Sequence, residues 1–242
     1  MSMNSASAVP PAAPGPLALH QPGVGFRREL PAGNPSQLPE TSASTNGRLR
    51  ITPQARAYAI WELARRAGVP IEFFRIWQIT VEAYQTVVEP IPGNPLQICF
   101  PHATPEHLET LSHGVPPATC RKSWVREPRP GVKSLIPDLI VPFVQDGNGS
   151  GEPLFVRKSV DCWECTVDLP LSIILSLSRW EELGSGERDV HGRFTAGQSV
   201  SHRDSFVHRP IVDEYGLAFE QVLQSIIPSW QPAERCLGAK VS

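Results

Sequence analysis

The segment at residues 175–215, LSLSRWEELGSGERDVHGRFTAGQSVSHRDSFVHRPIVDEY, sets the architecture because it joins two apolar helices through a densely polar connection. Charged and imidazole side chains recur through it among apolar residues, more regularly than anywhere else in the chain. They are Arg179, Glu181, Glu182, Asp189, His191, Arg193, His202, Arg203, Asp204, His208, Arg209, Asp213 and Glu214. Such a segment is the first place to look for a binding surface or a network of ion pairs.

Two amphipathic helices are predicted on either side of this connection. Residues 169–183 carry apolar side chains at helical spacing, and Gly184 follows the last periodic residue as a stop signal. Residues 212–227 carry a second apolar stripe. Asp213 and Glu214 stand in its first turn, where the helix dipole favours acidic side chains.

Helix and strand patterns alternate in the preceding part of the chain. Thr52 and Pro53 are typical of a helix start, as N-cap and first helical residue, and Gly68 is typical of the end of that helix. Runs of β-branched and aromatic residues between turn-forming residues predict strands. These runs lie at residues 71–88, 96–100, 139–144 and 154–156, and a short helix is expected from residue 105. We therefore expect an α/β or α+β fold in which a mixed sheet is flanked by helices.

Residues 1–47 have a different composition from the rest of the chain. They hold eight prolines and a single aromatic residue, Phe26. Such a segment cannot bury enough apolar surface to offset the entropy of ordering it, so we expect a disordered arm. A docking or tethering role for this arm is the alternative. A single folded domain is expected over residues 48–236.

Composition excludes several classes of protein. The 242 residues carry a formal net charge of −2, which gives no electrostatic attraction for nucleic acid or an anionic membrane. No apolar run approaches the roughly 18 residues of a membrane span, and no basic and apolar leader of a signal peptide is recognisable. The five cysteines are an odd number, which argues for reduced thiols rather than a disulfide framework. We expect a cytoplasmic protein with no membrane span and no nucleic-acid partner.

Three motifs of the polar connection resemble a known family. They read LSRWEE at residues 177–182, DVHGRF at 189–194 and RPIVDEY at 209–215. In this order they resemble the N-terminal accessory domain that precedes the catalytic domain in bacterial polysaccharide deacetylase-like proteins. The resemblance covers about residues 172–242 and is loose before them.

The resemblance implies a non-catalytic domain that packs on or orients a deacetylase-like catalytic domain, normally within the same chain. In the family, the catalytic domain is a hydrolase of carbohydrate metabolism that uses a divalent metal to remove acetyl groups from N-acetylated sugars. Residues 237–242 are similar to the short strand that leads into its metal-binding motif, so they are expected to begin a missing catalytic domain. No catalytic residue and no cofactor is then expected in this chain. Its partners would be that domain and, through it, a polysaccharide.

Ten residues are candidate motif or interdomain residues. Arg179 is expected to be partly buried and held by carboxylates, with Asp213 of the following helix among them. The alternative is that this group faces the catalytic domain or its sugar. Asp189 and Gly192 are expected to form a specific turn rather than a catalytic site. The ten are Arg179, Trp180, Glu181, Glu182, Asp189, His191, Arg193, His202, Arg209 and Asp213.

Two cysteines suggest a different class of function. Cys162 and Cys165 have the spacing of a zinc knuckle or a redox pair, and His191, His202 and His208 follow them in the chain. A second Cys-x-x-Cys motif is absent, so these cysteines are weak metal candidates. Two alternatives to the accessory domain stay open: a free-standing interaction protein without enzymatic activity, and a metal or redox module built on these cysteines.

Overall fold

A computed structural model describes most of the chain after residue 48. The described residues are 49–69, 75–80, 85–89, 97–113, 118–124, 138–145, 151–160, 162–184, 188–227 and 231–232. The chain divides into the units Met1–Ser36 and Gln37–Ser242, and all described residues belong to the second. The arm expected at residues 1–47 and the strand expected at 237–242 lie outside the described residues.

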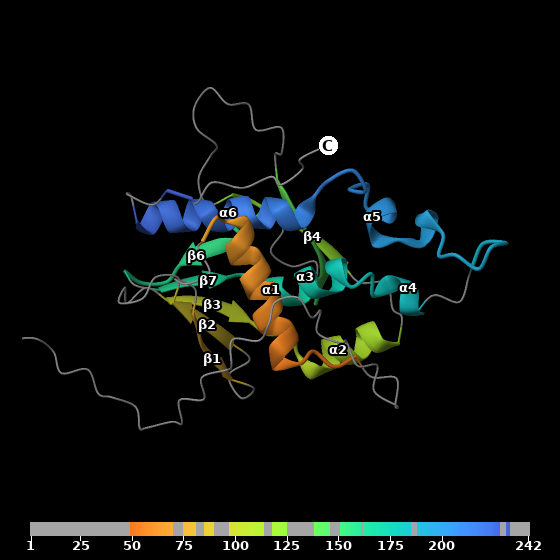
Figure 1. Cartoon of the computed structure of the whole chain (residues 1–242), viewed down its shortest axis with the longest axis horizontal. Helices are drawn as coiled ribbons and strands as arrows, with labels where there is room; N and C mark the ends of the chain where they lie inside the picture. The colour runs from red at the N-terminus through yellow and green to blue at the C-terminus, as the bar shows by residue number, and fades with distance from the viewer. Residues whose placement is uncertain are drawn as a thin grey trace, which may run out of the picture. The chain divides into compact units, whose positions relative to one another are not determined.

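Helices and strands are interleaved along this unit (Figure 1). The helices are α1 (Pro53–Arg66), α2 (Pro105–Ser112), α3 (Leu169–Leu177), α4 (Glu181–Gly184), the 3-10 helix η2 (Ala196–Gln198), α5 (Val200–Arg203) and α6 (Ile211–Ile226). The strands are β1 (Arg75–Thr80), β2 (Gln85–Glu89), β3 (Gln97–Pro101), β4 (Ala118–Lys122), β5 (Leu139–Val144), β6 (Phe155–Arg157) and β7 (Cys162–Cys165).

The strands form two sheets. The larger has the order β1-β2-β3-β7-β6, in which β3 and β7 are parallel and the other neighbours are antiparallel. The smaller is the antiparallel pair β4-β5. The described part of the chain is thus one α+β domain with a mixed sheet, and the predicted fold class is confirmed.

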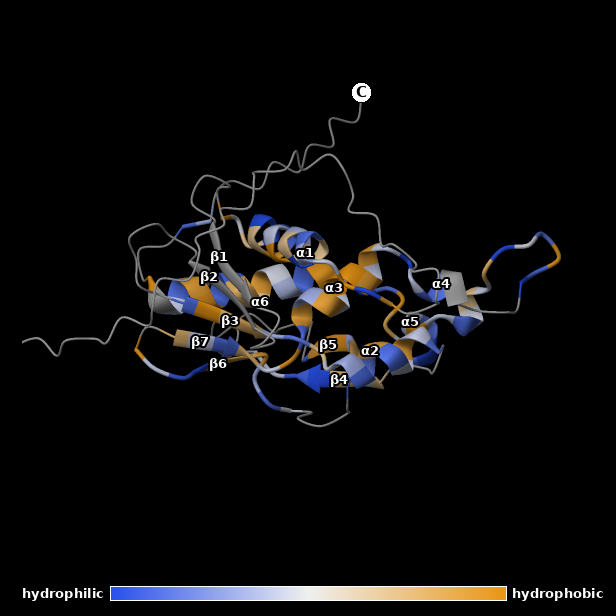
Figure 2. Cartoon of the chain, turned by 90° about the horizontal axis from the view of Figure 1, so that it is seen from below, coloured by the Kyte–Doolittle hydropathy of each residue, from blue (hydrophilic) through white to orange (hydrophobic). Residues whose placement is uncertain are grey.

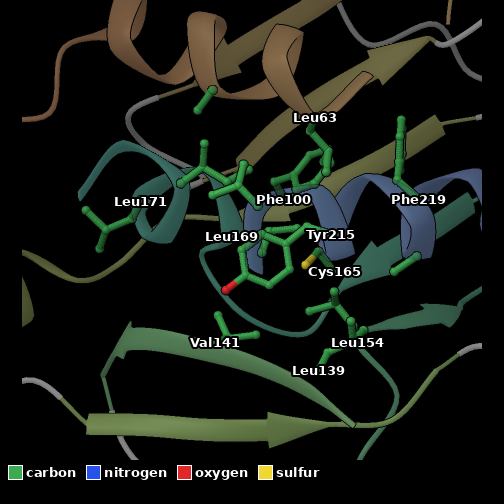
Figure 3. Close-up of a cluster of buried hydrophobic side chains, with 14 of the residues drawn as sticks. Leu63, Phe100, Leu139, Val141, Leu154, Cys165, Leu169, Leu171, Tyr215 and Phe219 are labelled. Atoms are coloured by element: carbon green, nitrogen blue, oxygen red, sulfur yellow. The ribbon is translucent and has the colours of Figure 1, made fainter. Parts of the chain in front are cut away.

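Helices α1, α3 and α6 build the core around which both sheets lie. Helix α1 packs on α3 and α6, α3 contacts both β3 and β5, and α6 also contacts β5. Figure 3 shows their apolar side chains meeting, with the Tyr215 hydroxyl turned toward the smaller sheet, where it donates a hydrogen bond of 2.5 Å to the Ile140 carbonyl. Phe219 lies 5.8 Å from Phe155 and 6.4 Å from Phe100, measured between ring centroids. Burial of these rings removes a large apolar surface from water and so stabilises the core.

The predicted helix starts are confirmed at α1 and α2. Thr52 accepts a hydrogen bond of 3.1 Å from the Ala55 amide, and Thr104 caps α2 in the same way through the His107 amide. Each threonine is followed by a proline at the first helical position. Gly68, with φ 79°, follows the end of α1 as expected.

The continuous helix predicted at residues 169–183 is wrong. Helix α3 ends at Leu177, and the short helix α4 starts at Glu181. Between them Arg179 has φ 52°, and the Trp180 amide bonds the Leu175 carbonyl, which is the pattern of a Schellman helix end. The left-handed position that stops the helix holds an arginine instead of the usual glycine, so no local pattern marks the end of the helix there.

The crossing of α1 and α6 depends on Gly216. A Cβ atom at this position would lie 2.5 Å from the Arg66 Cβ and 2.9 Å from the Arg66 carbonyl carbon. No real side chain fits at that separation, so only glycine allows the two helices to approach this closely. The close approach also places Arg66 beside the first turn of α6.

The described part of the chain contains no candidate for a membrane-spanning helix. None of the helices in the described ranges combines the length and the apolar character needed to cross a bilayer.

Candidate functional site

A cleft of about 350 Å³ opens where α3 and α4 meet α5 and the start of α6. We call it the α3–α6 cleft. Its charged lining is Arg66, Arg179, Glu181, Glu182, Arg209 and Asp213, and its apolar lining includes Phe143, Leu175, Leu177, Phe206, Val207 and Ile211. The cleft therefore combines an apolar floor with equal numbers of arginines and carboxylates.

Arg209 is the most firmly held of these arginines. Its Nε and NH2 groups donate to the two oxygens of Glu214 at 3.0 and 2.7 Å, and NH2 also donates to the Asp138 carbonyl at 2.5 Å. The Glu214 side chain is only 2% exposed. The hydrogen bond to Glu214 raises the pKa of Arg209, because the carboxylate favours the charged guanidinium. This bidentate pair fixes the wall of the cleft at the start of α6.

Arg66 crosses from α1 into the same wall. It forms an ion pair with Asp213, and its Nε lies 3.3 Å from Oε2 of Glu62. The Glu62 side chain is 8% exposed and that of Asp213 is 58% exposed. Arg66 therefore links a buried carboxylate to one at the mouth of the cleft.

The environment expected for Arg179 is wrong in two respects. Its side chain is 75% exposed rather than partly buried, and its ion-pair partner is Glu182 rather than Asp213. The left-handed backbone at Arg179 ends α3 and leaves the side chain in solvent. Asp213 is already paired with Arg66, a residue of α1 that lies more than a hundred positions away in the sequence.

Glu181 and Trp180 have structural contacts that the motif did not reveal. Oε2 of Glu181 accepts a hydrogen bond of 2.9 Å from the Val200 amide, which ties α4 to the start of α5. Trp180 is half-buried and packs edge-on against Phe143, with ring centroids 6.2 Å apart and planes at 85°. The first contact holds α4 against α5, and the second holds the α3–α4 turn against β5.

Backbone strain concentrates around the cleft. In the described ranges, the residues other than glycine with positive φ are Phe143 at 63°, Arg179 at 52° and Ser205 at 60°. Phe143 and Arg179 line the cleft, and Ser205 directly precedes the lining residue Phe206. Such residues cost energy and persist where the surrounding structure imposes them, commonly at functional sites.

The turn predicted at Asp189 is confirmed. Oδ1 of Asp189 accepts hydrogen bonds from the His191 and Arg193 amides at 2.8 and 2.9 Å, and Oδ2 accepts from Nε of Arg193 at 2.9 Å. Gly192 has φ 73°. The bonds from Arg193 and His191 lower the pKa of Asp189. The turn belongs to the loop between α4 and α5, which extends away from the helices in both views (Figure 2).

The structure brings together half of the ten candidate residues. Those that line the cleft are Arg179, Glu181, Glu182, Arg209 and Asp213. Asp189, His191 and Arg193 belong to the Asp189 turn, His202 is exposed on α5, and Trp180 packs on Phe143.

Cys162 and Cys165 do not converge on one site. They lie on β7, where partly exposed and buried residues alternate, so these two side chains point to opposite faces of the sheet. Cys165 is fully buried, and burial raises the pKa of its thiol to about 12. Within the described ranges, no cluster of three or more His, Cys, Asp or Glu side chains is placed to hold a metal ion.

Sequence reasoning missed Arg66 and Phe143. Arg66 reads as an ordinary basic residue in the last turn of a helix, and Phe143 reads as one more apolar residue of a buried strand. The sequence around each residue does not indicate that it lines a cleft. Both residues reach the cleft only because elements distant in the sequence pack together.

Comparison with known proteins gives one finding. The model of a family of unknown function (DUF7033) matches residues 122–228, which is less than half of the chain. No curated protein and no solved structure matches the chain. The matched segment contains every residue that lines the cleft except Arg66, so the cleft belongs almost entirely to the part of the chain that is similar to this family.

Proposed function

We propose that this chain is a non-catalytic accessory domain whose α3–α6 cleft docks and orients a polysaccharide deacetylase-like catalytic domain. One observation carries the proposal. The first and third of the motifs that resemble the accessory domains belong to separate parts of the chain, at the end of α3 with α4 and at the start of α6, and most of their residues line the same cleft. A motif that serves only local folding has no reason to converge in this way.

The charge balance of the cleft favours a protein surface over a small charged ligand. Arg66 is paired with Asp213, Arg179 with Glu182, and Arg209 with a buried glutamate. Because each guanidinium already has a carboxylate partner, the cleft offers no excess charge to attract an ion. Balanced polar groups around apolar contacts are typical of the rim and centre of a protein interface.

Apolar side chains at the cleft supply the attraction that such an interface needs. Leu177 is 38% exposed and Val207 is 52% exposed, and both line the cleft. They come from the end of α3 and from the segment before α6, so they flank the polar groups. A docked partner would remove both from water.

The polar groups of the cleft already have structural tasks, which supports a non-catalytic role. Glu181 binds the amide at the start of α5, and Arg209 is fixed by its buried partner. The proposal leaves deacetylation, and the divalent metal that it needs, to the partner domain. The polysaccharide would be bound there and not in this cleft.

We also propose a cytoplasmic location. The four cysteines in the described ranges, Cys99, Cys120, Cys162 and Cys165, are free thiols. Free thiols are typical of a reducing compartment.

The test is a binding titration of this chain with the deacetylase-like catalytic domain encoded in the same gene or beside it. Leu177→Asp and Val207→Asp place charge on the contact surface and are expected to weaken binding at least about tenfold each. Val160→Asp is the matched control, because Val160 is 74% exposed and does not line the cleft. Equal affinity of all three variants with the wild type would refute docking at the cleft.

A second measurement tests the non-catalytic role. The chain alone, incubated with N-acetylglucosamine oligomers and a divalent metal, is expected to release no acetate. Release of acetate by the purified chain, abolished by a substitution within it, would refute the accessory role.

A further inference from the structure

A pair of cysteines on neighbouring strands has no part in the proposed function. The sulfur atoms of Cys99 on β3 and Cys162 on β7 are 4.0 Å apart. In the parallel register Cys99 lies opposite Glu164, and Cys162 lies opposite Gln97. Cys99 and its partner Glu164 lie on the same face of the sheet, because directly opposed residues share a face. Cys162 is two residues from Glu164 on β7 and so lies on that face as well.

This face leaves both thiols accessible. Cys99 and Cys162 are partly exposed, whereas Cys120 and Cys165 are completely buried. Oxidants in water can therefore reach the first two thiols and not the others. The Cys-x-x-Cys spacing in the sequence pointed to the wrong partner for Cys162, because its neighbour in space is a cysteine 63 residues earlier in the chain.

We propose that Cys99 and Cys162 form a reversible intrachain disulfide when the protein meets a peroxide. The sulfur of Cys162 attacks one oxygen of hydrogen peroxide, the O–O bond breaks, and a sulfenic acid and one water result. The sulfur of Cys99 then attacks the sulfenic sulfur, its proton leaves with the hydroxyl group as a second water, and the S–S bond forms. Two thiols are oxidised and one peroxide is reduced to two waters.

The surroundings assign the order of these two steps. Two causes raise the pKa of Cys99 to about 11: burial, which is the larger, and the nearby Cys162 thiol. The Cys99 thiol therefore stays protonated near neutral pH. A protonated thiol is a poor nucleophile toward peroxide. Cys99 is therefore disfavoured in the first step, and it reacts in the second because the sulfenic sulfur of Cys162 forms next to it, where the two sulfur atoms are 4.0 Å apart.

The geometry explains why the bond would be reversible. A disulfide has an S–S distance of about 2.0 Å, so the two sulfurs must approach by about 2 Å. The cysteines are diagonal rather than directly opposed in the register, and both are partly exposed. A partly exposed disulfide is reduced more readily than a buried structural one.

Bond formation would link β3 to β7 and close a loop that contains α2, β4, β5 and β6. Cross-linking a loop of this length lowers the entropy of the unfolded chain. The oxidised protein is therefore expected to melt at a temperature higher by about 5 °C than the reduced protein.

The experiment treats the full chain with one equivalent of hydrogen peroxide and maps the cysteines by peptide mass spectrometry. We expect a cross-linked Cys99–Cys162 peptide lighter by two hydrogen atoms, which a mild dithiol reverses. Cys99→Ser and Cys162→Ser should each abolish it. Cys120→Ser and Cys236→Ser are the controls and should keep it.

Several outcomes would overturn the inference. They are sulfinic acid without a cross-link, a disulfide that persists in Cys99→Ser or Cys162→Ser, and cross-links only between molecules. Circular dichroism and the melting temperature of the reduced variants guard against misfolding. If one serine variant is misfolded by these two measures, the other serine variant and the peptide map of the wild type still show whether the Cys99–Cys162 bond forms.

Discussion

Among single residues, two of the arginines that line the cleft have opposite environments. Arg209 makes a bidentate ion pair with Glu214, whose side chain is 2% exposed. Arg179 is 75% exposed and pairs with Glu182, whose side chain is 26% exposed. Water screens the second pair and not the first, so their contributions to stability should differ strongly even though the pairs have the same chemistry.

Replacement of the carboxylates tests this difference. Glu214→Gln removes the bidentate carboxylate and leaves Arg209 only Asp138, whose Oδ1 lies 3.5 Å from NH1, so it should lower the free energy of unfolding by about 2 kcal/mol. Glu182→Gln, the matched control, should lower it by less than about 1 kcal/mol. Urea unfolding of the two variants gives both values. Equal losses would show that the Arg209 pair is no better shielded from water than the Arg179 pair.

Arg179 also tests whether the strain at the cleft serves function. Arg179→Gly removes the steric cost of φ 52° and should raise the free energy of unfolding by up to about 1 kcal/mol. The same variant loses a side chain at the proposed contact surface and should bind the catalytic domain more weakly. Thermal melting and the binding titration measure the two effects. A variant that is less stable, or that binds as well as the wild type, would contradict this view of the residue.

At the scale of elements, the crossing of α1 and α6 positions the cleft. Gly216 lets α6 approach the backbone of Arg66, and Arg66 then reaches Asp213 in the first turn of α6. The wall of the cleft and the close packing of these two helices are therefore one structural feature.

A methyl group at this crossing should separate the helices. Gly216→Ala would place its Cβ 2.5 Å from the Arg66 Cβ, so the helices must move apart, at a cost of about 1–3 kcal/mol despite the better helix propensity of alanine. Gly197→Ala is the matched control, since nothing lies within 4 Å of a Cβ there. Chemical denaturation compares the two. A stabilising effect of Gly216→Ala would mean that the crossing tolerates a side chain.

The elements with strong local signals were predictable, and those made by packing were not. Thr52 and Thr104 marked two helix starts because capping is a local interaction. The end of α3 was missed because its left-handed residue is an arginine. Strand β4 was missed because it contains Arg121 and Lys122. The Lys122 side chain is 1% exposed, and its ammonium group lies 3.6 Å from a carboxylate oxygen of Glu152.

At the scale of the whole molecule, the fold class followed from the alternation of helix and strand signals, but the sheet order did not. The parallel pairing of β3 with β7 joins strands more than sixty residues apart in the sequence, and no local sequence pattern predicts this pairing. The same limit applies to the site. The motifs at residues 177–182 and 209–215 identified five lining residues, while Arg66 and Phe143 came only from tertiary packing.

Global stability should depend on the titration of His102. Burial is the main cause that lowers its pKa from 6.5 to about 4, with the nearby Arg56 adding to it and Asp168 opposing it. Between these values the unfolded chain binds more protons than the folded protein. Stability is therefore lost as the pH falls through this window. The shift corresponds to about 3 kcal/mol, which solvent screening of the half-buried ring reduces to about 2 kcal/mol, and no further loss from it occurs below about pH 4.

Urea unfolding at about pH 7 and about pH 4.5 measures this loss. The difference between the two values should be smaller in His102→Gln than in the wild type, because the variant has no titrating group there. His202→Gln, at an exposed position, should keep the wild-type difference. The same pH dependence in all three proteins would exclude His102 as its source.

We propose that the α3–α6 cleft is a docking surface for a deacetylase-like catalytic domain. Hydrogen exchange detected by mass spectrometry, on this chain with and without the catalytic domain encoded with it, would reveal such docking. We predict slower exchange on docking in residues 175–182 and 206–213, and unchanged exchange in the Asp189 turn at residues 188–194. Unchanged exchange at the cleft, or the absence of any deacetylase-like domain encoded in or beside the gene, would contradict it.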